Sequence, residues 1–251
     1  MTLPREGQAA PPLMLSAPTA ADLMTPNPAS QPLIVAIDGP SGAGKGTIAR
    51  EVAARLKYRH VDTGAMYRAV GWKAVKEGLD LSDEEALTAL AAHARIVVGD
   101  GVITVDGHDV RSAIRTPEID AAATAVARQP RVREVLIAQQ REMGVRGGVV
   151  MEGRDIGTVV FPGAPVKIYL DASPEERARR RASDPAHAAG MGGTAVQDVA
   201  SALAARDRSD STRAVSPLSI AADAVVMDTT GVPIDEVVDR VMALVREREK
   251  K

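Results

Sequence analysis

A glycine-rich segment that contains one lysine has the spacing of a phosphate-binding loop. It occupies residues 39–47 and reads Gly-Pro-Ser-Gly-Ala-Gly-Lys-Gly-Thr. The glycines would let consecutive backbone N–H groups turn inward around a triphosphate, whose β- and γ-phosphates Lys45 can reach. A Gly-rich turn can also be a simple tight connection. The lysine at this spacing, between an apolar strand and an amphipathic helix, nevertheless favours a nucleotide site.

The residue after Lys45 narrows the class of nucleotide site. Gly46 stands where Ser or Thr usually binds magnesium, and Thr47 follows one place later. This Gly-Lys-Gly-Thr ending resembles that of nucleoside monophosphate kinases. The likeness implies Mg²⁺ bound with ATP and held mostly by phosphates and water, and it makes a GTPase-like switch less expected.

Two further segments could hold a second anionic ligand, which a kinase of small nucleotides must position and neutralise. Thr63 lies at the expected start of a helix, and Arg68 lies one to two turns into it. Taken alone, this segment can equally be an ordinary helix cap followed by a solvated arginine. Residues 152–158, Glu-Gly-Arg-Asp-Ile-Gly-Thr, follow a buried strand, at the position where open α/β sheets bind ligands.

Two arginine-rich stretches are ambiguous. Residues 206–213 alternate positive and negative side chains, which on its own favours a solvated helix face with internal ion pairs. The same applies to Arg177, Arg179, Arg180 and Arg181, although Arg177 and Arg181 share a helix face at spacing four.

Short apolar runs alternate with helical patterns along the chain. Buried strands are predicted at residues 33–38, 149–151, 166–170 and 224–227. One of the helices opens with a capping box at residues 173–176. This alternation predicts an α/β fold with a parallel core sheet.

One stretch interrupts the alternation. Residues 96–108 carry two Asp-Gly turn signals between β-branched runs, which predicts small antiparallel hairpins. We therefore expect about residues 72–130 to form an inserted α+β subdomain. The Gly-Met-Gly-Gly-Thr segment at 190–194 is expected to be a mobile loop.

Composition excludes several function classes. The chain has 31 basic and 33 acidic residues and no cysteine, so we expect neither nucleic-acid nor anionic-membrane binding and no disulfide or thiolate site. The four histidines lack ligand spacing, and no apolar run has the length of a membrane helix. Residues 1–31, rich in Pro and Ala, are expected to be a disordered tail, with a signal peptide as the alternative. A cytoplasmic monomer is expected.

Four segments together resemble bacterial cytidylate kinases, at residues 37–47, 62–68, 153–162 and 213–218. The likeness covers nearly everything from Leu33 onward. It implies an ATP-dependent nucleoside monophosphate kinase that transfers the γ-phosphoryl group of ATP-Mg to CMP, giving CDP and ADP, and that also accepts dCMP and, weakly, UMP. It further implies a kinase domain over residues 32–251, with a P-loop core, an enlarged monophosphate-binding insert and a short lid at about residues 177–194.

The resemblance also implies the site residues. ATP would be bound by the loop residues Gly39, Pro40, Ser41, Gly42, Ala43, Gly44, Lys45, Gly46 and Thr47. The CMP phosphate would be held by Thr63, Arg68, Arg154 and Arg213, the cytosine by Thr124, Arg133 and Asp155, and the ribose hydroxyls by Arg206 and Asp210. Lys45, Arg154 and Arg181 would neutralise charge during the transfer. The chain departs from the family pattern at Glu152, where Asp is more frequent, and in its long N-terminal tail.

Other functions share the phosphate loop. Adenylate, uridylate and shikimate-type kinases are the alternatives among enzymes. A non-catalytic nucleotide sensor is an alternative of another class, and it would bind ATP without a second anion site. The set of arginines counts against the sensor.

Overall fold

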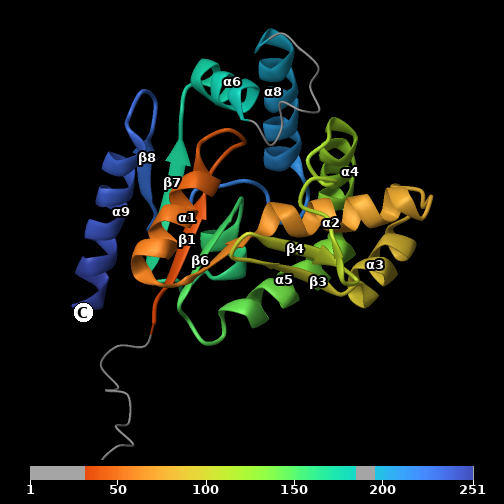
Figure 1. Ribbon diagram of the computed structural model, residues 1–251, viewed down its shortest axis with the longest axis horizontal. Coiled ribbons are helices and arrows are strands. Elements are labelled where there is room, and N and C mark those ends of the chain that lie inside the picture. The colour runs from red at the N-terminus through yellow and green to blue at the C-terminus, as the bar shows by residue number, and fades with distance from the viewer. Residues whose placement is uncertain (1–31, 185–195, 251) are drawn as a thin grey trace, which may run out of the picture. The chain divides into compact units, whose positions relative to one another are not determined.

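The computed structural model describes residues 32–184 and 196–250, and a five-stranded sheet forms its centre (Figure 1). The strand order is β2 (Arg59–Asp62), β6 (Val149–Gly153), β1 (Ile34–Asp38), β7 (Val166–Asp171) and β8 (Val225–Asp228), and every neighbouring pair is parallel. The four strands predicted from apolar runs all lie in this sheet. The predicted α/β class with a parallel core is therefore confirmed.

Helices cover both faces of the sheet, which is why its strands are apolar on both sides. On one face, α1 (Lys45–Leu56) and α9 (Ile234–Glu249) pack in one cluster with Ile37 and Ile168. On the other face, α5 (Pro130–Gly144) and the short π-helix η1 (Ile156–Val160) pack in a second cluster with Ala36 and Met151.

A separate core lies in the segment between β2 and β6. There α2 (Thr63–Lys76), α3 (Glu84–His93), α4 (Pro117–Arg128) and α5 pack around side chains such as Met66, Leu87 and Leu136. An antiparallel sheet of β3 (Ile96–Gly99), β4 (Val102–Val105) and β5 (His108–Asp109) completes it. Asp100 and Asp106 have positive φ and precede glycines at the two turns, so the predicted hairpins are confirmed. The bounds of the insert and of the lid stay predictions.

Two helices pack together after β7. In α6 (Pro174–Ser183) the Ser173 hydroxyl accepts a hydrogen bond from the Glu176 amide, which confirms the predicted helix start. Val199 and Leu203 of α8 (Val196–Thr212) pack on Ala178 of α6. The predicted loop at 190–194 and the predicted tail at 1–31 lie outside the described residues. Within the described ranges, no helix has the length and apolar character that a bilayer span requires.

The strand register brings the polar segments that follow β1, β2 and β6 to the same edge of the sheet. Asp38 pairs with Gly153 across β1 and β6, and Asp62 pairs with Glu152 across β2 and β6. The loop after β1, the helix start after β2 and the charged segment after β6 therefore meet at the carboxyl ends of parallel strands.

At this edge Gly39 has no room for a side chain. Its φ is +147°, and a Cβ there would lie 2.0 Å from the backbone oxygen of Leu170. We predict that Gly39→Ala lowers the free energy of unfolding by about 2 kcal/mol or more, because backbone strain and overpacking add. Urea unfolding measures this difference.

Gly163→Ala is the matched control, since nothing lies within 4 Å of its Cβ position and its φ is not in the left-handed region. It should stay within about 0.5 kcal/mol of wild type. Equal effects of the two substitutions would contradict the packing explanation.

Candidate active site

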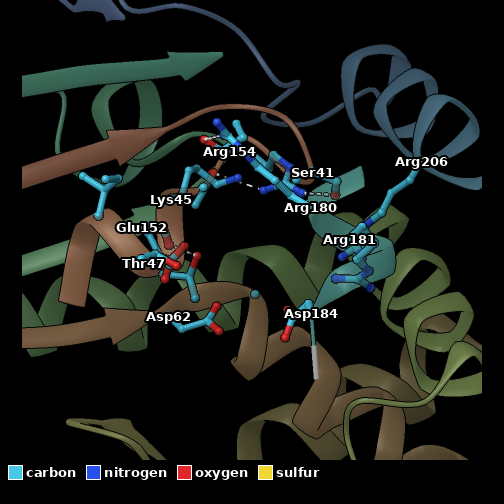
Figure 2. Close-up of a pocket in the computed structure, with 18 of the residues that line it drawn as sticks. Ser41, Lys45, Thr47, Asp62, Glu152, Arg154, Arg180, Arg181, Asp184 and Arg206 are labelled. Carbon is cyan, nitrogen blue, oxygen red and sulfur yellow. Dashed lines mark hydrogen bonds between the residues drawn. The ribbon is translucent and has the colours of Figure 1, made fainter. Parts of the chain in front are cut away.

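A cavity of about 750 Å³ lies at the carboxyl edge of the sheet. Figure 2 shows Lys45, Arg154 and Arg181 converging on it from the loop, the end of β6 and α6. The cavity collects nearly all of the site residues predicted from the sequence, namely residues 41–47, Thr63, Arg68, Thr124, Arg133, Arg154, Asp155, Arg181, Arg206, Asp210 and Arg213. Gly39 and Pro40 of the loop do not line it.

Lys45 is held inside the phosphate loop. Gly42 and Gly44 adopt left-handed φ values of 80° and 89°, which curl the backbone around the lysine. The Lys45 Nζ donates a hydrogen bond to the backbone oxygen of Pro40 at 2.7 Å. Burial, and next the positive charge of Arg154, lower the pKa of Lys45 to about 7. A bound anion would favour the protonated form of Lys45, so Lys45 would take up a proton when an anion binds in the loop.

Asp38 joins the loop strand to the segment that follows β6. Its carboxylate accepts hydrogen bonds from the amides of Ile156 at 2.8 Å and Gly157 at 2.7 Å. Burial raises the pKa of Asp38 to about 6 in spite of these bonds. The two amides fix the start of η1, and with it the direction of Arg154 and Asp155 just before it.

Arg154 spans the cavity. Its Nη2 donates to the Ser41 hydroxyl at 2.7 Å, and its Nε donates to Asp210 of α8 at 2.9 Å. The guanidinium thereby connects the phosphate loop to the charged end of α8.

Asp155 lies beside two arginines that also line the cavity. It accepts a hydrogen bond from Arg133 Nη2 at 2.5 Å, and Arg213 Nη2 lies 3.7 Å from its other oxygen. The Arg133 guanidinium stacks over the ring of Tyr67, 5.3 Å from the centroid. Arg133 Nε and Arg213 Nη2 are buried without a hydrogen-bond partner. Unpaired donors beside a carboxylate can recognise a polar ring edge.

A third group of arginines surrounds Asp120 in the first turn of α4. Arg68 Nε donates to Asp120 Oδ1 at 2.9 Å, Arg206 Nη1 lies 3.3 Å from the same oxygen, and Arg181 donates to Oδ2. Burial acts to raise the pKa of Asp120, yet the three arginines hold it well below its usual value. The Asp120 carboxylate is therefore ionised at physiological pH.

The stretch at residues 206–213 presents one face to the cavity and one to solvent. Arg206, Asp210 and Arg213 line the cavity, whereas Arg208 is exposed. The solvated-face interpretation thus applies to only part of this segment. In α6, Arg177 donates to Asp207 and to the Ser41 backbone oxygen, so it too has tertiary partners.

Comparison with known proteins identifies the family. A family model described as cytidylate kinase matches residues 35–247. The chain belongs to the cytidylate kinase family. Cytidylate kinases of Solibacter usitatus and Geobacter sulfurreducens are 48% and 49% identical to it, over 86% and 87% of this chain and 93% and 94% of theirs. A shikimate kinase structure from Bacteroides thetaiotaomicron shares 11% identity at a TM-score of 0.47, over 85% of this chain and 98% of that one.

Membership makes the chain an ATP-dependent nucleoside monophosphate kinase. Motif spacing missed two polar groups, of which Asp207 contacts the cavity-lining loop and Arg180 lines the cavity itself. Asp207 accepts a hydrogen bond from the Ser41 amide at 3.1 Å. Arg180 donates to Thr229 after β8, next to the apolar side chains of Val232 and Ile234. Their signals were weak, because Asp207 and Arg180 lie in stretches that resemble solvated helix faces.

The cytidylate kinase family implies ATP-dependent phosphoryl transfer, which generally uses Mg²⁺, so we compared the cavity with the usual environment of that ion. The described residues contain no cluster of three or more His, Asp or Glu side chains suited to a metal. Single oxygen donors do line the cavity at Thr47, Asp62 and Glu152. A Glu152 oxygen lies 3.2 Å from the position that a Cβ on Gly46 would take. One or two carboxylates with phosphates and water are the usual Mg²⁺ environment.

The lowered pKa of Lys45 predicts proton uptake on ATP binding. At pH 8 a group with a pKa of about 7 is mostly neutral in the free enzyme. Phosphate oxygens near Nζ favour the charged form, so the complex should hold the proton. Calorimetric titration with ATP, in buffers of different ionisation enthalpy, should give uptake of most of one proton at pH 8 and much less at pH 6. Lys45→Met should abolish the uptake at pH 8, and uptake that persists in this variant would mean that another group binds the proton.

Proposed function

We propose that this kinase transfers the γ-phosphoryl group of ATP-Mg to CMP, giving CDP and ADP, with dCMP as a further acceptor and UMP as a weaker one. The observation that carries the proposal is Arg154, whose guanidinium contacts both Ser41 in the phosphate loop and Asp210 in α8. The phosphate loop and the arginine-rich side of the cavity therefore share one arginine. Transfer between two polyanions needs this arrangement, whereas a nucleotide sensor does not.

ATP is assigned to the side of the cavity that the loop forms. The loop at residues 39–47, of which residues 41–47 line the cavity, holds the triphosphate together with the N-terminus of α1. The apolar side chains of Val232 and Ile234, with Arg180 beside them, offer a wall for the adenine. Magnesium carried by ATP would neutralise charge on the β- and γ-phosphates, with Thr47 and Glu152 as nearby oxygen donors.

CMP is assigned to the arginine side. Its phosphate lies against Thr63, Arg68, Arg154 and Arg213, and its ribose hydroxyls against Arg206 and Asp210. Its cytosine edge faces Asp155, with Arg133 and Thr124 on the rest of the ring. The unpaired Arg133 Nε and Arg213 Nη2 support this assignment, because a bound nucleotide can accept from both.

The chemical step needs positioning more than proton transfer. An anionic oxygen of the CMP phosphate attacks the γ-phosphorus, and the bond to the ADP oxygen breaks on the opposite side. Lys45, Arg154 and Arg181 offset the charge on the transferred group. The packing of α6 and α8 over the loop would keep water from the γ-phosphate.

We further propose a monomeric, cytoplasmic enzyme whose kinase domain spans residues 32–251. Its insert would cover about residues 72–130 and its lid about residues 177–194.

A coupled assay of ADP release tests the proposed reaction. With ATP-Mg, the enzyme should be fastest with CMP and dCMP, slower with UMP, and inactive with AMP and shikimate. A preference for AMP or shikimate would replace the assignment by one of the related kinases, and ATP binding without any acceptor-dependent release would favour a sensor.

Asp155 should decide the choice of base. An ionised carboxylate only accepts hydrogen bonds, so it suits the exocyclic amine of cytosine and repels the carbonyl of uracil. One charged hydrogen bond is worth about 1.5 to 3 kcal/mol. We predict that Asp155→Asn shrinks the ratio of kcat/KM for CMP over UMP by about ten- to a hundredfold, mainly through lost CMP activity.

A different role for Asp155 would give a different result. If Asp155 only held an arginine in place, its substitution would weaken both nucleotides in parallel. Its partners are Arg133 and Arg213, whereas Arg154 pairs with Asp210. An unchanged CMP to UMP ratio would therefore mean that Asp155 orients Arg133 and does not contact the base.

Asp210 should act on the acceptor nucleotide. We predict that Asp210→Ala raises KM for CMP much more than KM for ATP, because the carboxylate is assigned to the ribose hydroxyls. The increase should be smaller for dCMP, which lacks one of them. Arg208→Ala, on the exposed side of α8, is the control and should leave both KM values near wild type. Equal mild effects of the two substitutions would restore the solvated-helix interpretation.

A further inference from the structure

Asp120 is a charged group that the proposed reaction does not use, yet three arginines of that reaction converge on it. Arg68 comes from α2, Arg181 from α6 and Arg206 from α8. Asp120 itself belongs to α4 in the insert. One carboxylate thus connects the acceptor side of the cavity with both helices that follow β7.

The packing of α4 on α2 fixes the place of this carboxylate. Gly71 lies one turn after Arg68, and a Cβ on it would lie 3.1 Å from that of Ala122. The missing side chain lets the two helices approach closely. Arg68 and Asp120 consequently meet through a 2.9 Å hydrogen bond.

Asp120 stands behind the arginines and not among the groups that face the ligand. Arg68, Arg181 and Arg206 all line the cavity, whereas Asp120 is absent from its lining. Each arginine contacts Asp120 through one nitrogen, Nε in Arg68, Nη2 in Arg181 and Nη1 in Arg206. A guanidinium carries five N–H donors, so each keeps donors for a ligand on its other side.

Because Arg68, Arg181 and Arg206 carry like charges, their close arrangement requires a carboxylate nearby. Burial, followed by the repulsion of Arg68 and Arg154, lowers the pKa of Arg206 to about 10. Without a nearby carboxylate, these like charges would turn away from one another and towards solvent. The Asp120 carboxylate offsets the repulsion and sets the orientation of all three side chains.

We propose that Asp120 is a positioning residue for the phosphoryl transfer, which holds Arg181 over the transferred group while it fixes Arg68 on the acceptor phosphate. This inference rests on the proposed assignment of CMP to the arginine side. The family resemblance assigned no role to Asp120. We predict that the effect of Asp120 on catalysis passes through Arg181.

A double-mutant cycle tests this dependence. Asp120→Asn should lower kcat with CMP by about ten- to a hundredfold, raise KM for CMP, and leave KM for ATP within about twofold. In the Arg181→Ala background the same substitution should change kcat by less than about twofold, because the arginine through which Asp120 acts is gone. A merely structural role would instead give effects that multiply in the double variant.

Two further variants complete the experiment. Asp109→Asn removes an exposed carboxylate that pairs with Arg111 outside the cavity, and its kinetics should match wild type. Asp120→Glu keeps the charge and should recover most of kcat. If Asp120→Asn does not fold, as judged by its thermal unfolding, the cycle with Asp120→Glu replaces it, and the smaller loss of kcat expected there should again vanish in Arg181→Ala.

The possible failures can be told apart. Tighter CMP binding by Asp120→Asn would overturn the inference and make Asp120 a competitor of the substrate phosphate. Multiplicative effects in the double variant would overturn it in favour of a structural ion pair. If the wild-type enzyme did not phosphorylate CMP, the proposed function would fall first and this inference with it.

Discussion

The burial of several arginines at one edge of a sheet is the constraint on which the site depends. A guanidinium stays protonated at any physiological pH, so a buried arginine needs a carboxylate close by. Three aspartates meet this need, with Asp155 beside Arg133, Asp210 beside Arg154 and Asp120 beside Arg68. Each pair forms within the protein itself, and each arginine lines the cavity. Guanidinium groups held in this way provide the preorganisation that charge stabilisation requires.

The order of the strands places the loop side and the arginine side of the cavity next to each other. β6 lies between β1 and β2, so the phosphate loop after β1 and the helix after β2 flank the charged segment after β6. Asp38 strengthens this arrangement, because its carboxylate binds the amides of Ile156 and Gly157 across the strand ends. The helices after β7 then reach back over the loop through Arg177 and Asp207. Residues far apart in sequence can thus act on one transferred group.

Local signals were sufficient to predict the framework. The phosphate loop, the helix start at Ser173 and the Asp-Gly turns each depend on a few adjacent residues, and all form where predicted. The capping box is only half formed, because the Ser173 amide donates to Thr230 and the Glu176 carboxylate binds Arg179 and Arg180. The arginine partners could not be found in this way. Asp120 binds residues 52, 61 and 86 positions away, and in the sequence it looks like an ordinary acidic residue in the first turn of a helix. Which side of α8 faces the cavity likewise depends on tertiary packing, since Arg206 and Arg208 both flank Asp207 in one run of alternating charges.

A crystal structure of the enzyme with CMP and ADP-Mg would test the central claim most directly. We predict the CMP phosphate against Arg68 and Arg154, the cytosine amine within hydrogen-bonding distance of Asp155, and the ADP phosphates in the loop around Lys45. Asp120 should still hold Arg181 in that complex. A CMP phosphate bound away from Arg68 and Arg154, or a cytosine that does not contact Asp155, would contradict it.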